Sequence, residues 1–161
     1  MSGISPMSLD ERAGFVENII QYSFTNRAIL HEALRTPGAP VITGRPHRSD
    51  GNKDLAQIGD AVLELVLVKD GYEDNNVARG DRIVQSQASN RHLAHMGFKA
   101  GLESVILINP SQPTVSTGVM ATTVEAILGA VYLDSEMNVQ AVRAVMALLD
   151  LGWPACTDPY V

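Results

Sequence analysis

The sequence predicts an all-α domain, and three observations lead to that fold class. Apolar residues recur at helical spacing in one segment after another along the chain. Segments rich in proline and glycine, at 36–51 and 110–118, separate these stretches as loops. The 161 residues are 45% hydrophobic and 19% charged, which is a globular composition, and the length is that of one domain able to bury a core.

Six segments carry the helical pattern: 10–21, 26–35, 52–70, 77–97, 119–133 and 138–150. The first places Phe15 and Ile20 on one face, and Ser8 or Asp10 is its candidate N-cap. The second is amphipathic and ends before Pro37, which cannot continue a helix. These two segments are therefore predicted to be short surface helices.

The later segments differ in how their apolar residues are distributed. The third is apolar nearly all round after Gly59, so we expect a central buried helix. The fourth repeats apolar residues such as Ile83 and Leu93 at helical spacing, and a shorter helix is expected between Gly97 and Gly101. The fifth is a second strongly apolar helix, and the sixth is amphipathic.

Charge and targeting signals limit the classes of function. The net charge of −6 gives no general attraction for phosphate, so binding of nucleic acid needs a local basic patch. Cys156 is the single cysteine, which excludes an intramolecular disulfide and a cysteine-rich metal site. The first ten residues lack a secretory pattern and a clear mitochondrial one, and the run Ala61–Val68 is too short to span a bilayer. We expect an intracellular protein, cytoplasmic or nuclear, with no membrane partner.

Several sequence blocks follow one another in an order and spacing that resemble the ribonuclease III domain family. They are Val16–Phe24 with Asn26, Leu30 and Ala33-Leu34; Leu55 with Ile58–Glu64; Gly80, Ser89-Asn90, Leu93-Ala94 and Gly101-Leu102; and Val124–Asp134. The similarity covers roughly residues 14–150. No single block is decisive, but the ordered set is specific.

The resemblance implies a fold, an assembly and a chemistry. Family members have an all-helical domain that forms dimers and binds magnesium through carboxylates to hydrolyse double-stranded RNA. We accordingly expect an N-terminal extension at 1–13, a ribonuclease III-like domain at 14–150 and a C-terminal tail at 151–161. Since the chain ends soon after its last predicted helix, we expect no separate double-stranded-RNA-binding domain.

Two of the four principal metal-ligand positions implied by the resemblance are acidic here. Asp60 and Glu125 keep the carboxylates, whereas Ala56 and Thr122 replace them, and Lys53 stands at a further acidic position. Magnesium prefers several converging oxygen ligands. We therefore expect Asp60 and Glu125 to form a metal site that is weak or absent, with no cofactor or only weakly bound magnesium or manganese.

Two substitutions raise questions about charge and assembly. Lys53 lies seven residues before Asp60, two turns along one helix face, so its ammonium group is a candidate substitute for the lost metal; a solvated lysine is the alternative. Gln57 stands where the family usually has a large apolar residue that enters the partner subunit. We nevertheless expect a homodimer through the 52–70 helix, because its apolar residues need burial.

Other polar clusters have simpler interpretations. His92 and His95 have a possible metal-ligand spacing but no evident third ligand, so a surface or half-buried pair is favoured. Scattered cations give two regions a modest basic character: the middle region, with Arg79, Arg82, Arg91 and Lys99, and the first long loop, with Arg45, His47 and Arg48. In both regions we favour solvated side chains over a phosphate-binding site.

Three functions remain open from the sequence. The first is a catalytically inactive or strongly impaired ribonuclease III-fold protein in RNA processing or a ribonucleoprotein assembly, with double-stranded RNA or a ribonucleoprotein as partner. The second is a weak metal-dependent endoribonuclease that cleaves double-stranded RNA through Asp60 and Glu125, with Thr122 holding a metal-bound water. The third is a protein-interaction module without an RNA role, which the acidic charge supports.

Overall fold

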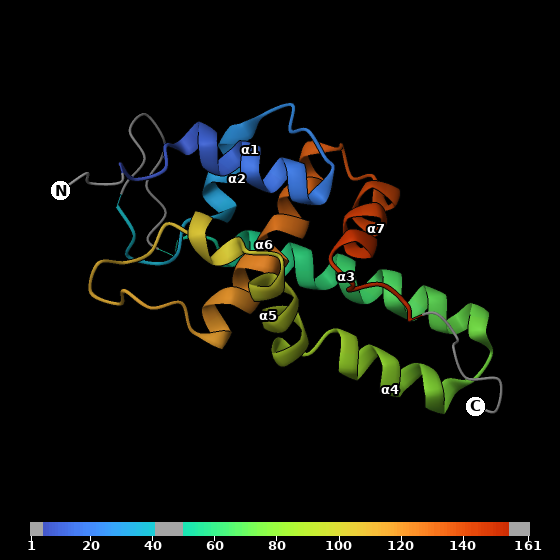
Figure 1. Cartoon of the computed structure of the whole chain (residues 1–161). Helices are drawn as coiled ribbons and strands as arrows, with labels where there is room; N and C mark the ends of the chain where they lie inside the picture. The colour runs from blue at the N-terminus through green and yellow to red at the C-terminus, as the bar shows by residue number, and fades with distance from the viewer. Residues whose placement is uncertain (1–4, 41–49, 155–161) are drawn as a thin grey trace.

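Seven α-helices and one 3-10 turn make up the computed structural model, which describes residues 5–40 and 50–154 (Figure 1). Their bounds are α1 Leu9–Ile20, α2 Arg27–Ala33, α3 Lys53–Asp74, α4 Val77–Gln87, α5 Asn90–Lys99, η1 Leu102–Val105, α6 Thr117–Asp134 and α7 Val139–Leu148. The described residues contain no strand, only an isolated bridge between Arg35 and Leu107. The all-α prediction is confirmed.

Helix α6 lies at the centre of the domain. Its side chains are buried on nearly every face, including Met120, Ile127 and Leu128, and α3, α5, α2 and α7 all contact it. Helices α1, α2 and α7 lie on one side of α6, and α5 lies on another (Figure 1). Because α6 is apolar all round, it can only be stable when other helices surround it.

Helices α3 and α4 form a hairpin that projects from the rest of the domain (Figure 1). The first half of α3 packs on α6, but Leu65 and Val68 further along are about half exposed, at 56% and 54%. The expectation that α3 is the central buried helix was therefore wrong. Its apolar second half has no helix packed over it on one face, and α6 occupies the centre instead.

The predicted helix at 77–97 is two helices. Helix α4 ends at Gln87 and α5 begins at Asn90, with Ser89 between them as the α5 N-cap. The Ser89 hydroxyl accepts a hydrogen bond from the backbone N–H of His92 at 3.2 Å, which starts a new helix in place of continuing the old one. The sequence pattern did not reveal this break, because both helices bury one face and their apolar residues therefore recur at helical spacing on either side of it. Helix α5 also continues through Gly97 to Lys99, so the short helix expected between Gly97 and Gly101 is the end of α5, and the next short helix is η1 after Gly101.

The chain ends and the first loop are described only in part. Helix α1 begins at Leu9, capped by Ser8, whose hydroxyl and backbone pair reciprocally with Glu11. The C-terminal tail packs closely at its start: Leu151 is fully buried and Trp153 is half-buried. Cys156 and the loop cations Arg45, His47 and Arg48 lie outside the described residues. No helix in the described part of the chain is long and apolar enough to cross a membrane.

Candidate functional site

The site lies where α3 and α6 cross at very short distance. A Cβ atom placed on Gly59 would stand 1.7 Å from the carbonyl oxygen of Glu125, and one on Gly129 would stand 2.1 Å from the carbonyl oxygen of Leu55. Only hydrogen fits at these two positions, so the two helix backbones touch directly. This contact brings the residue after Gly59 next to the second helix.

Asp60 and Glu125 are neighbours across this crossing. Both side chains are half-buried. Burial, and to a smaller extent the negative charge of Asp60, raise the pKa of the Glu125 carboxyl from 4.5 to about 7. The two carboxylates that the sequence singled out are thus close enough to repel each other, and burial of Glu125 favours its protonated form near neutral pH.

The other three positions of the predicted set carry no acid. Ala56 is buried, at 5% exposed, one helical turn before Asp60. Thr122 is half-buried one turn before Glu125, and Lys53 is exposed at the first position of α3. Within the described residues Lys53 forms no ion pair with Asp60 or Glu125, which agrees with the solvated-lysine alternative.

These residues do not fit a magnesium site built from four carboxylates. The described part of the chain contains no group of three or more histidine, cysteine, aspartate or glutamate side chains placed to hold a metal ion. A buried methyl group at Ala56 offers no ligand, and only the two oxygen donors Asp60 and Glu125 remain. Magnesium can be held by one or two carboxylates only when water or phosphate completes its shell.

A network of buried hydrogen bonds stabilises the start of α3. The sequence did not predict it. The Asn52 amide donates hydrogen bonds to the carbonyl oxygen of Ala33 at 2.8 Å and to the Thr123 hydroxyl at 3.3 Å. Asn52 and Thr123 are 1% and 0% exposed, and this network joins α2, α3 and α6 behind the site. The polar side chain at the N-cap position of α3 was the available signal.

Asp134, at the end of α6, stabilises a different part of the fold. Its carboxylate accepts hydrogen bonds from the backbone N–H groups of Thr25 and Asn26, both at 2.9 Å, and from the Tyr22 hydroxyl at 2.8 Å. Although burial acts in the opposite direction, these donors lower the pKa of Asp134. Its role is structural, because it anchors the turn between α1 and α2.

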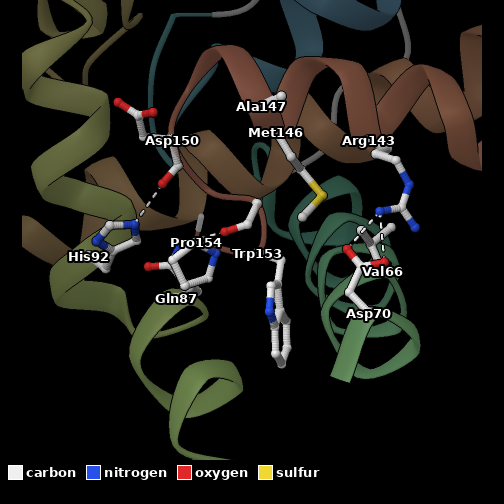
Figure 2. Close-up of a pocket in the computed structure, with 11 residues that line it drawn as sticks. Val66, Asp70, Gln87, His92, Arg143, Met146, Ala147, Asp150, Trp153 and Pro154 are labelled. Atoms are coloured by element: carbon white, nitrogen blue, oxygen red, sulfur yellow. Dashed lines mark hydrogen bonds and ion pairs between the residues drawn. The ribbon is translucent and has the colours of Figure 1, made fainter. Parts of the chain in front are cut away.

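A cavity of about 460 Å³ lies between α3, α4, α5, α7 and the start of the tail, and neither Asp60 nor Glu125 lines it (Figure 2). Two tail carbonyl groups accept hydrogen bonds from helix side chains: Gly152 from Gln87 at 2.6 Å, and Asp150 from His92 at 2.9 Å. On the far side the Arg143 guanidinium pairs with Asp70 at 2.6 Å. The sequence did not predict this cavity, because four helices and the start of the tail must meet to form it.

The middle basic region lies on α4 and α5. Arg91, His95 and Lys99 are exposed and recur every four residues, so they share one face of α5. Arg79 pairs with Asp74 at 3.4 Å, whereas Arg82 forms no ion pair within the described residues. A hollow of about 440 Å³ opens beside this face and is lined by Ser86, Ser89, Arg91, His92 and His95.

Comparison with known proteins yields one consistent family. The family model for the ribonuclease III domain matches residues 53–136, just over half of the chain. A Ribonuclease 3 of Idiomarina loihiensis is 34% identical over 132 residues, covering 76% of this chain and 53% of that protein. A Ribonuclease 3 of Vibrio campbellii is 29% identical, covering 86% of this chain and 58% of the relative. The chain thus spans about half the length of the curated relatives it matches.

Solved structures agree on the fold. A nuclease domain of ribonuclease III from Campylobacter jejuni, described for structural flexibility in its region of dimer formation, superposes with a TM-score of 0.72 at 19% identity. The match covers 87% of this chain and 97% of that one. A second structure of the same nuclease domain gives a TM-score of 0.69, with 96% and 98% coverage.

Proposed function

The chain belongs to the ribonuclease III domain family, and on that premise we propose that its catalytic activity is absent or strongly impaired and that it acts in RNA processing or a ribonucleoprotein assembly. The observation that carries the proposal is the pairing of Asp60 and Glu125 without further acids. Hydrolysis of a phosphodiester needs a metal-activated water and a charge clamp on the leaving oxygen. Asp60 and Glu125 supply two of the four acidic metal ligands that the family resemblance implies for this hydrolysis.

Burial at the altered positions supports the proposal. Ala56 is packed in the core, so no water-filled space replaces the missing carboxylate there. Glu125 itself has a pKa near 7 because of its burial and of Asp60, so a metal must displace its proton before it binds. Both effects lower the affinity for magnesium relative to a site with four ionised acids.

The exposed face of α5 supports contact with RNA. Residues 82–102 contain three Lys or Arg residues and two His residues but no Asp or Glu, in a chain whose net charge is −6. Arg91 and Lys99 are exposed and form no ion pair within the described residues, so both are free to approach phosphate. We propose this face as the contact with duplex RNA.

We also propose a homodimer through α3. Gln57, Ala61, Leu65, Val68 and Tyr72 are all exposed, and their helical angles fall within about 80° of one another. The last three residues form an apolar stripe, which α4 extends with Val77 at 81% exposure. A stripe of this kind favours an interface, and Gln57 adds a polar group at its end in place of an apolar one.

A cleavage assay separates the three possible functions. Purified protein is incubated with labelled duplex RNA in magnesium and then in manganese, beside Asp60→Asn. We expect no cleavage, salt-dependent RNA binding, and activity restored when Ala56→Glu and Thr122→Asp are combined. Circular dichroism checks that the double variant folds, since Ala56 is buried.

Other outcomes would overturn this proposal in distinct ways. Metal-dependent cleavage that Asp60→Asn abolishes would identify a weak endoribonuclease in which two carboxylates suffice. Neither cleavage nor salt-dependent binding of RNA would indicate a protein-interaction module without an RNA role.

A further inference from the structure

A second cleft, of about 270 Å³, opens beside the start of α3 and the start of α6. Its walls include Thr36, Asn52 and Lys53 on one side and Gly118, Val119 and Thr122 of α6 on the other. Its walls are tied together, because the backbone N–H of Thr36 and its hydroxyl both donate to the carbonyl oxygen of Leu107, each at 3.0 Å. Asp60 and Glu125 do not line it, whereas Lys53 and Thr122, two altered positions of the predicted metal site, do.

The lining of this cleft attracts negative charge. Lys53 is its single ionised side chain, no lining residue is acidic, and Lys53 has no ion-pair partner among the described residues. Gly118 and Val119 come from the first turn of the 18-residue α6, where backbone N–H groups and the helix dipole favour anions. Asp54, the next residue of α3, does not line the cleft.

Asn52 provides an independent indication of a ligand. Asn52 lines the cleft and is 1% exposed, and both hydrogen bonds of its side chain use the amide nitrogen. Its Oδ1 atom is buried without a hydrogen-bond partner. Because an unpaired buried acceptor is unfavourable, a group that donates a hydrogen bond is favoured beside it.

We propose that this cleft binds one ribonucleotide unit of an RNA strand without a divalent cation. The phosphate lies at Lys53 and the start of α6, and a ribose hydroxyl donates to Asn52. The volume of about 270 Å³ is below that of pockets for drug-sized ligands and suits a single sugar and phosphate. The choice of RNA rests on the proposed function, whereas the preference for an anion with a hydroxyl group follows from the cleft itself.

The charge at residue 53 sets this site apart from a metal site. The family resemblance places an acid at that position, which would repel phosphate unless a cation intervened. Lys53 reverses the sign, and Thr122 replaces a second acid on the cleft wall with a neutral hydroxyl that can donate a hydrogen bond. A phosphate can therefore approach directly.

The test compares two charge-matched variants of the full chain by amide NMR in EDTA. Adenosine 5′-monophosphate, its 2′-deoxy form, inorganic phosphate and a short single-stranded RNA are titrated in turn. Lys53→Gln removes the proposed contact. Lys69→Gln is the control, because it makes the same charge change on α3 at an exposed lysine outside the cleft.

We expect adenosine 5′-monophosphate and RNA to shift the amide signals of Lys53, Gly118 and Val119. Lys53→Gln should weaken binding about tenfold, as expected for one charge-assisted hydrogen bond, and Lys69→Gln should change it less than twofold. The 2′-deoxy form should bind several-fold more weakly. RNA should bind at least as tightly as the free nucleotide, which would identify a strand as the source of the phosphate.

Contrary results are equally specific. Equal losses for the two variants would show general charge attraction and no built site, and dependence on magnesium would restore a metal site; either overturns the inference. If inorganic phosphate binds with the same affinity as adenosine 5′-monophosphate, the ribose contact is overturned. If the free nucleotide binds more tightly than RNA, RNA is overturned as the ligand. Duplex RNA binding through α5 with no shifts at the cleft would overturn the inference while leaving the proposed function intact.

Discussion

Replacing Glu125 by glutamine should make the protein more stable at pH 8 and leave its stability almost unchanged at pH 5. The pKa of Glu125 is about 7 in the folded protein against an ordinary value of 4.5, because of burial and the charge of Asp60. Between these two values the folded state holds a proton that the unfolded state has released. The free energy of unfolding therefore falls as pH rises from about 4.5 through 7.

The size of the effect follows from that difference. Since one pKa unit corresponds to about 1.4 kcal/mol, the difference sets an upper bound of roughly 3 kcal/mol. Glu125 is only half-buried, so solvent screening reduces this, and we expect roughly 1–2 kcal/mol. Most of this free energy is lost between pH 5 and pH 8, where the folded carboxyl ionises.

Urea unfolding followed by circular dichroism measures the effect. Wild type, Glu125→Gln and the exposed control Glu103→Gln are compared at pH 5 and pH 8, in EDTA and at one protein concentration, since dimerisation shifts stability. The control should show the same stability as wild type at both pH values. If the difference in stability between Glu125→Gln and wild type is the same at both pH values, or if the variant is less stable than wild type at pH 8, the raised pKa of Glu125 is refuted.

Two further changes test the crossing and the interface. Gly59→Ala should lower the free energy of unfolding by at least about 3 kcal/mol or prevent folding, because its methyl group would meet the Glu125 backbone at 1.7 Å. The control Gly14→Ala, where no atom lies within 4 Å, should stabilise α1 by about 0.5–1 kcal/mol. Equal shifts in melting temperature for the two variants would contradict the close crossing. Val68→Ser with Tyr72→Ser should yield monomers in sedimentation while the helical content measured by circular dichroism stays unchanged, since both side chains are more than half exposed. A dimer that persists would place the interface elsewhere.

Local chemistry explains why much of the fold was predictable. The apolar spacing of the 10–21 and 138–150 segments and the helix-ending Pro37 depend on neighbours in sequence, and these helices lie within two residues of the predicted bounds. The break between α4 and α5 was missed because both helices bury one face, and the signal was only the capping serine at 89. The centre of the domain was assigned to α3 and not α6 for a related reason, since composition does not show which apolar face a neighbour covers.

The sequence by itself determined the fold class, the candidate pair Asp60 and Glu125, and the loss of acids at Ala56 and Thr122. Helical periodicity and side-chain identity are local properties, so they are visible without coordinates. Only the tertiary structure decided that Gly59 and Gly129 let two backbones touch, which places the two carboxylates together and raises one pKa. It also decided that Lys53 faces a cleft with Asn52 and α6. Distances between residues far apart in the chain depend on how the helices pack, and no spacing in the sequence records them.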